Sequence, residues 1–189
     1  MLAARCSARR SSPSAPPVSL WTQFLHELRQ PEYIHVLLHP LPIYGLAAGF
    51  LSLVLAWAVR SRAAQAVALV LILLTALAAW PVAHFGREAY DRVYAMSGQP
   101  AQHWLDWHAY LAERIVWVHY AAAAVAAGTL ICLWRVPRWQ RLSLVLTLAV
   151  TLAALGLGGF LAFVGGKIRH SEFRDGPPPV IVRSDVAGD

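Results

Sequence analysis

Histidine is the residue type in this chain with the most potential for chemistry. The eight histidines are His26, His35, His39, His84, His103, His108, His119 and His170. His39 stands at the start of one long apolar segment, His84 closes a second, His119 lies inside a third, and His170 follows a fourth. Imidazole is a common axial ligand of haem iron, and two histidines from facing helices make a low-spin electron-transfer site.

His119 is the most informative of these residues. Its neighbours are Trp117, Val118, Tyr120 and a run of alanines. An ionisable side chain inside an apolar span is costly, so it usually faces the interior of a bundle and has a partner there. The eleven residues from His108 to His119 make about three helical turns, so these two side chains share one helical face.

The pattern predicts one site near the ends of the four segments. The predicted cofactor-binding residues are His39, His84, His119, His170 and Tyr44, and the predicted metal ligands among them are His119, His39 and His84. The predicted cofactor is a b-type haem or a quinone. A zinc or copper site is an alternative, and so is a set of interfacial histidines bonded to carbonyls, water or lipid headgroups.

Other kinds of site are not indicated. The two cysteines, Cys6 and Cys132, form no CxxCH or CxxC motif, so neither a covalent c-type haem nor a cysteine-based zinc site is expected. No serine or cysteine lies in a recognisable nucleophile motif, and no glycine loop for phosphate is present.

The composition is that of a membrane protein. Of 189 residues, 58% are hydrophobic and 14% are charged, whereas about a quarter of the residues in a typical soluble domain are charged. Four apolar segments cover residues 41–59, 63–83, 115–134 and 142–164. Each approaches the roughly 20 residues that span a bilayer as a helix. The predicted fold is an all-α, antiparallel bundle of four transmembrane helices.

The distribution of charge predicts the orientation of the bundle. The short loops at 60–62 and 135–141 contain five arginines and no acidic residue, so the positive-inside rule places them in the cytoplasm. Both termini and the long 85–114 connection then face the periplasm of a bacterium, with the chain in the inner membrane. Trp80, Trp104 and Trp107 are expected at the outer membrane boundary. The net charge of +6 is thus explained by topology, and no nucleic-acid partner is expected.

The chain divides into four regions. Residues 1–18 are predicted to be a disordered tail, and residues 19–34 an amphipathic helix in the membrane interface that Pro31 ends. The bundle covers residues 35–170, and its third helix is expected to begin near Pro100 and to project from the membrane. Residues 171–189 are predicted to be a flexible tail. Small residues recur every fourth position in the fourth helix, which allows a neighbouring helix or a flat cofactor to approach closely: Ala154, Gly158, Ala162 and Gly166.

The sequence His39-Pro40-Leu41-Pro42-Ile43-Tyr44 resembles the opening of a family of bacterial four-helix membrane proteins known as a domain of unknown function. That family has a histidine early in its third helix, which His119 resembles, and a glycine-rich fourth helix, which Gly158-Gly159 and Gly165-Gly166 resemble. Tyr44 stands where the family's second histidine usually falls. Relatives of the family occur near or fused to haem-carrying periplasmic domains, so the resemblance implies a redox setting.

These observations predict a membrane electron-transfer subunit that holds a b-type haem or a quinone near the periplasmic face. The expected partners are the lipid bilayer and other membrane or periplasmic redox subunits. The alternative is a non-catalytic scaffold subunit of a larger membrane complex. A transporter is disfavoured because the span interiors lack the charged residues of an ion path.

Overall fold

A computed structural model describes residues 19–180, so the tail predicted at residues 1–18 and the end of the second tail lie outside the described residues. Within 19–180 the chain is helical and has no strand. Four helical segments are long and apolar enough to cross a membrane, at residues 31–58, 62–96, 99–135 and 137–169. The prediction of an all-helical membrane protein with four spans is therefore supported at this level.

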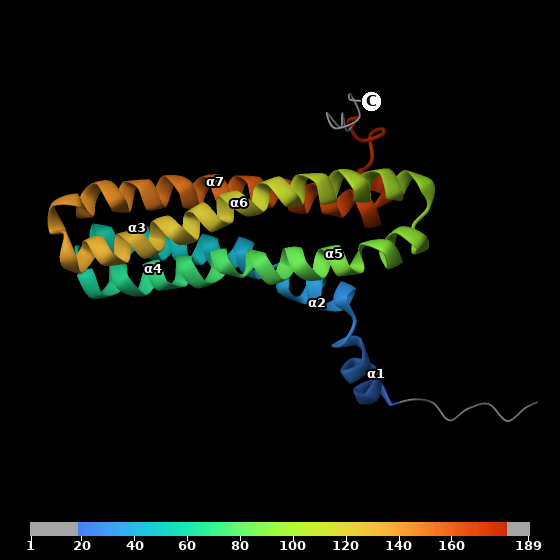
Figure 1. The fold of residues 1–189 in the computed structure, drawn as a ribbon, viewed down its shortest axis with the longest axis horizontal. Coiled ribbons are helices and arrows are strands. Elements are labelled where there is room, and N and C mark those ends of the chain that lie inside the picture. The colour runs from blue at the N-terminus through green and yellow to red at the C-terminus, as the bar shows by residue number, and fades with distance from the viewer. Residues whose placement is uncertain (1–18, 181–189) are drawn as a thin grey trace, which may run out of the picture.

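The elements, shown in Figure 1, are α1 (Leu20–Glu27), α2 (Pro31–Leu38), a π-helical turn (Leu41–Gly45), α3 (Leu46–Ala58), α4 (Arg62–Leu77), α5 (Ala79–Met96), α6 (Gln99–Arg135), a 3₁₀ turn (Pro137–Trp139), α7 (Gln140–Arg169) and a second 3₁₀ turn (Ser171–Phe173).

Local sequence signals explain where the helices begin and bend. The Ser61 hydroxyl accepts a hydrogen bond from the Ala64 amide and caps α4. Pro31 occupies the first turn of α2, where its missing N–H costs nothing, so it begins a helix instead of ending one. Pro81 cannot donate to the carbonyl one turn before it, and α4 gives way to α5 at Ala78, in the turn before that proline.

One half of the bundle is a close-packed apolar core. It is built by α3, α4, the C-terminal half of α6 and the N-terminal half of α7, which lie together on one side of Figure 1. Its fully buried side chains include Leu46, Leu53, Leu69, Ile72 and Leu133. This core stabilises the half of the molecule that contains the two short arginine-rich loops.

Two glycines, one at the end of the π-helical turn and one in α3, bring this part of the chain into very close contact with α4. A Cβ atom added to Gly45 would lie 2.3 Å from Cγ2 of Thr75, and one added to Gly49 would lie 2.7 Å from Cγ1 of Ile72. Such separations are far below normal contact distances. These two positions, four residues apart, require glycine because the facing helix occupies the space of a side chain.

Several polar side chains in this core are hydrogen-bonded, whereas the buried Thr151 hydroxyl has no partner within residues 19–180. The hydroxyls of Thr129 and Thr147 are 2.8 Å apart and join α6 to α7, and Thr129 also donates to the Ser143 carbonyl. Gln140 donates to Gln65, which in turn donates to the carbonyl of Ala56. Each pair satisfies groups that would otherwise be costly to bury in lipid.

The other half of the bundle projects beyond the apolar zone. The predicted 85–114 connection is almost entirely helical, since α5 runs to Met96 and α6 begins at Gln99. The third helix does begin one residue before Pro100 and, at 37 residues, is about 55 Å long. That length exceeds the roughly 30 Å hydrocarbon core of a bilayer, so α6 extends past it.

Exposed tryptophans mark two levels on the bundle. The Tyr90 hydroxyl donates to Asp106, which places these residues of α5 and α6 at one level. Measured from this bond toward the core half, Trp80 lies ten residues away along α5 and Trp117 lies eleven residues away along α6. These two exposed tryptophans are therefore at nearly the same height along the bundle axis. Trp117 is about 26 Å along α6 from the exposed Trp134, close to a hydrocarbon thickness.

The expectation for Trp104 is wrong. Its side chain is buried, and it lies about 20 Å beyond Trp117 along α6. The ring packs 4.9 Å from the ammonium group of Lys167 on α7. Trp104 therefore packs inside the projecting half and does not mark a membrane boundary.

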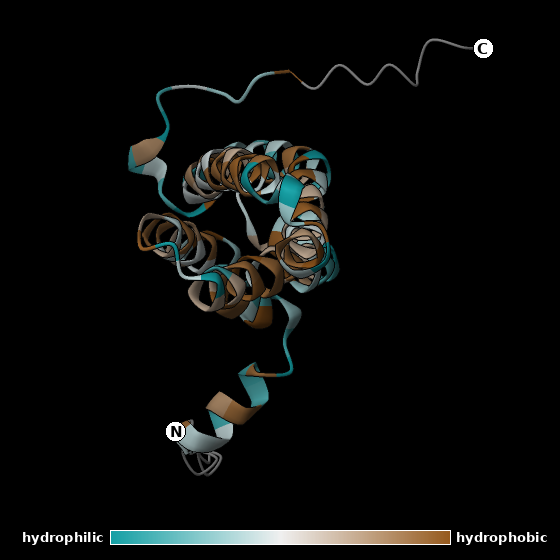
Figure 2. Cartoon of the chain, turned by 90° about the vertical axis from the view of Figure 1, so that its left-hand side faces the viewer, coloured by the Kyte–Doolittle hydropathy of each residue, from teal (hydrophilic) through white to brown (hydrophobic). Residues whose placement is uncertain are grey.

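The segment predicted as one interfacial helix is two helices. Leu28 to Gln30 separate α1 from α2, and only α2 packs on the bundle, against α5. In Figures 1 and 2, α1 points away from the bundle, and Figure 2 shows the remaining helices grouped around a common centre. The placement of α1 in the membrane interface stays a prediction.

Candidate functional site

A cavity of about 1090 Å³ lies between α2, α5, α6 and α7 in the projecting half of the bundle. Four histidines line it: His35 from α2, His39 directly after α2, and His108 and His119 from α6. Much of the remaining wall is apolar or glycine. A concave, mostly apolar pocket with a few convergent polar groups is the usual form of a cofactor or small-molecule site.

His119 lies at the inner end of the cavity and is only 4% exposed. Its Nδ1 is 3.2 Å from the carbonyl of Ile115, one turn earlier in α6. Because a carbonyl can only accept, Nδ1 carries the proton and Nε2 keeps a free lone pair in the neutral ring. Gly158 of α7 packs against this ring, since a Cβ added there would lie 3.4 Å from Nε2, so part of the predicted small-residue stripe of α7 faces this histidine.

A backbone carbonyl also fixes the orientation of the His35 ring. Its Nδ1 is 2.8 Å from the carbonyl of Val82 in α5, which again leaves Nε2 without the proton. A Cβ on Gly86 would lie 2.9 Å from Nδ1, so α5 needs glycine here to accept the ring. Ligand histidines are usually oriented by such a bond from the nitrogen that does not bind the metal.

His108 completes a group with His35 and His39. It lies within electrostatic range of both of those rings, with the stronger interaction to His35. The ring centroids of His35 and His39 are 6.0 Å apart. Nδ1 of His108 is buried beside the Leu161 carbonyl, outside hydrogen-bonding geometry, and a Cβ on Gly165 would lie 3.3 Å from it. Each of the four cavity histidines thus has a ring nitrogen without a protein partner among residues 19–180.

The other predicted site residues lie outside this cavity. His84 stacks on Trp80 and is 3.4 Å from Glu88, one turn later in α5. His170 bonds to Glu172, and Tyr44 is 73% exposed at the start of the first span. Only His39 and His119 of the predicted set line the cavity. Across residues 19–180, no three His, Cys, Asp or Glu side chains form a group that could hold a metal ion, so His119, His39 and His84 are not brought together.

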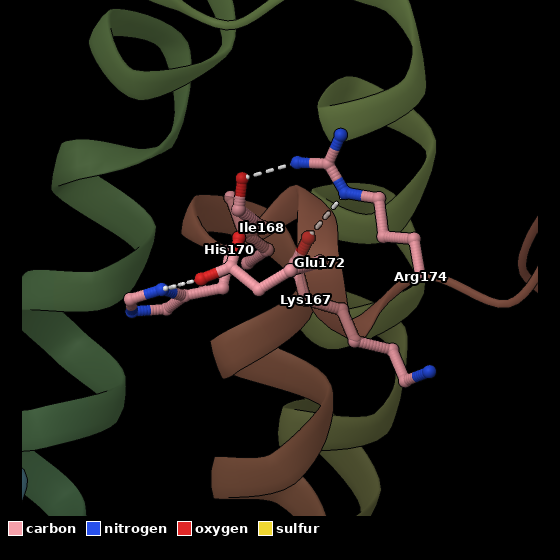
Figure 3. A network of polar contacts seen from close by, with 5 residues as sticks. All are labelled: Lys167, Ile168, His170, Glu172 and Arg174. Atoms are coloured by element: carbon pink, nitrogen blue, oxygen red, sulfur yellow. Dashed lines mark hydrogen bonds and ion pairs between the residues drawn. The ribbon is translucent and has the colours of Figure 1, made fainter.

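The segment after α7 is bound to the outer end of that helix. Arg174 donates from Nε to the carbonyl of Lys167 and from a terminal nitrogen to that of Ile168, as Figure 3 shows. Lys167, only 6% exposed, donates to the carbonyl of Phe173. The backbone N–H of Glu172 and the ring of His170 hold the pKa of the Glu172 carboxyl below its usual range. The first residues of the predicted flexible tail are therefore attached to the bundle.

Sequence reasoning did not select His35 and His108 as site residues. A signal for each was present: His35 and His39 are four residues apart, and His108 shares a helical face with His119. These spacings show which histidines share a face of one helix. They do not show which faces of different helices point at each other.

Comparison with known proteins adds no further constraint. No family model, no curated protein and no solved structure matches this chain. The family resemblance therefore stays a prediction, and the functional conclusion depends on the cavity.

Proposed function

We propose that this chain is an electron-transfer subunit that holds a b-type haem in the histidine-lined cavity. One observation carries the proposal: four histidines from two helices line a single cavity, and each keeps a ring nitrogen without a protein partner. Leaving buried polar groups unpaired costs free energy, so a ligand that binds these nitrogens would stabilise the protein. Bound haem would supply one-electron redox chemistry.

The donor set fits a haem better than a bare metal ion. A porphyrin supplies four nitrogens itself, so the protein needs only two imidazoles on opposite sides of the ring. We assign this role to His35 and His108, which come from different helices and lie within electrostatic range of each other. The Val82 carbonyl orients His35 for this task, and α7 supports His108 through the close approach of Gly165.

Basic and acidic side chains both line the cavity, the acidic ones being Glu27, Glu32, Asp106 and Glu113, and two of its arginines are available for an acidic cofactor edge. Arg87 and Arg169 line the cavity, and neither forms an ion pair or hydrogen bond within residues 19–180. Unpaired guanidinium groups readily take carboxylates in bidentate fashion. They can therefore bind the propionates of a haem without breaking an existing contact.

The proposed setting is the bacterial inner membrane. The two arginine-rich loops favour a cytoplasmic position for the core half of an antiparallel four-helix bundle. The projecting half, with the cavity and both chain ends, then lies on the periplasmic side. Redox partners would reach the cavity from that side, as membrane or periplasmic subunits.

The visible spectrum of the full chain, purified in mild detergent from haem-replete cells, tests the proposal. The reduced protein is expected to show the sharp bands of a six-coordinate b-type haem. His35→Ala and His108→Ala should each abolish or broaden these bands. His103→Ala is the matched control, because His103 is an exposed histidine on the same helix as His108 and lines no part of the cavity.

Two outcomes contradict the proposal at different levels. If the bands persist in both variants and disappear in His39→Ala or His119→Ala, the axial assignment is wrong while the haem remains. If the protein purifies colourless and does not bind added haem, the electron-transfer function fails. A structural subunit would then be the better description.

A further inference from the structure

The inner end of the cavity has a separate polar group that the haem assignment does not use. His119 is almost completely buried, two residues inward of the exposed Trp117 on α6. It lies about 16 Å along the helix from His108. His108, in contrast, lies within electrostatic range of both His35 and His39. His119 therefore lies apart from the other cavity histidines, at the level of the outer membrane boundary.

The chemistry of His119 is that of a hydrogen-bond acceptor. The Ile115 carbonyl holds the ring proton on Nδ1, so Nε2 presents a lone pair. Within residues 19–180, Nε2 has no hydrogen-bond partner. The group that satisfies it must carry an O–H or N–H donor.

The surroundings of Nε2 are apolar, and the helix that packs against the ring carries glycine there. Gly158 and Ile43 lie nearest to Nε2 among the cavity residues, and Ile115 lies one turn earlier on the same helix as His119. A Cβ on Gly158 would lie 3.4 Å from Nε2 and 3.8 Å from Cγ1 of Ile43, so any side chain longer than a methyl group at this position would crowd Nε2, which lines the cavity. A fitting ligand is therefore neutral, largely apolar and equipped with a hydroxyl group.

We propose that this inner end binds a lipid-soluble hydroquinone, whose ring hydroxyl donates a hydrogen bond to Nε2 of His119. The position of His119 at the membrane boundary suits a ligand that arrives from the bilayer. The choice of a hydroquinone among hydroxyl-bearing lipophiles rests on the proposed electron-transfer function. The hydrogen bond itself does not, because it follows from the tautomer of His119 and the apolar wall.

The geometry predicts a preference for the reduced form of the ligand. A quinol has hydroxyl donors, whereas a quinone has only carbonyl acceptors, which a lone pair on Nε2 cannot bind. Loss of one buried hydrogen bond corresponds to about a tenfold loss of affinity. Decylubiquinol should therefore bind the full-length protein about tenfold more tightly than decylubiquinone, as measured by ligand-dependent thermal stabilisation in detergent.

Three variants test the assignment. His119→Phe should remove the preference for the quinol, and His119→Gln should bind both forms about equally, because its amide both donates and accepts. Gly158→Leu should block both ligands by filling the space before Nε2. Gly159→Leu is the matched control, since nothing lies within 4 Å of a Cβ at Gly159, and it should bind like the unmodified chain.

The results separate this proposal from the haem proposal. Equal binding of quinol and quinone by the unmodified chain, or an unchanged preference in both His119→Gln and Gly158→Leu, overturns the hydroquinone site. Tighter binding of a hydroxyl-bearing sterol than of decylubiquinol also overturns it. If the protein is colourless yet shows the His119-dependent preference, the haem proposal fails and the hydroquinone site stands. If it shows haem bands but no such preference, the reverse holds.

Discussion

Replacement of Gly49 by alanine tests the packing that holds the core half together. The added methyl group would lie 2.7 Å from Cγ1 of Ile72 and 3.2 Å from its backbone nitrogen. A backbone atom cannot rotate away as a side chain can, so α3 and α4 must separate. Overpacking of this kind costs about 1–3 kcal/mol.

A second glycine provides a control with the same chemical change. Gly156 lies on the exposed face of α7, and nothing lies within 4 Å of a Cβ there. Alanine is favoured over glycine inside a helix by roughly 0.5–1 kcal/mol, and this gain applies at both positions. The difference between Gly49→Ala and Gly156→Ala therefore reports the overpacking alone.

Thermal unfolding of the purified variants in one mild detergent measures this difference. For a chain of this size, about 1–3 kcal/mol corresponds to a Tm difference of roughly 2–12 °C. Ile72→Ala removes the nearest clashing atom, so the cost of Gly49→Ala should become smaller in that background. Equal Tm values for Gly49→Ala and Gly156→Ala, or the same cost with and without Ile72, would refute the reasoning.

Three further outcomes are expected. Thr129→Val should lower Tm by about 1–2 °C, since the bond to Thr147 joins α6 to α7 and such bonds contribute roughly 0.6 kcal/mol in membranes; an unchanged Tm would mean that the pair adds nothing. Arg174→Gln should speed amide hydrogen exchange in the last turn of α7, because that turn loses the donors to its final carbonyls, and unchanged exchange would contradict this capping role. A reporter active only in the periplasm should function when fused after Asp189 and fail when inserted at Arg138, and the reverse pattern would invert the proposed orientation.

Much of the fold was predictable because hydropathy acts over long stretches of chain. The four apolar segments and their helical state follow from length and composition alone. The projection of the third helix followed from Pro100 and an unbroken pattern to Leu133. The boundary near Pro31 was misjudged, since a proline both ends a preceding helix and suits the first turn of the next.

Which residues line the site could be identified only from the tertiary structure. His39 and His119 were selected from sequence and do line the cavity, while His84 was selected for its place at a segment end and lies outside it. Likewise, the sequence pointed to close approach at the small residues of α7, but the tightest contacts are those of Gly45, in the π-helical turn, and Gly49, in α3, with α4. The physical reason is the same in both cases. A sequence determines how far along a helix each residue lies and which residues share its face, but the direction of that face depends on how the helix is rotated against its neighbours, and only the packing of the whole bundle sets that rotation.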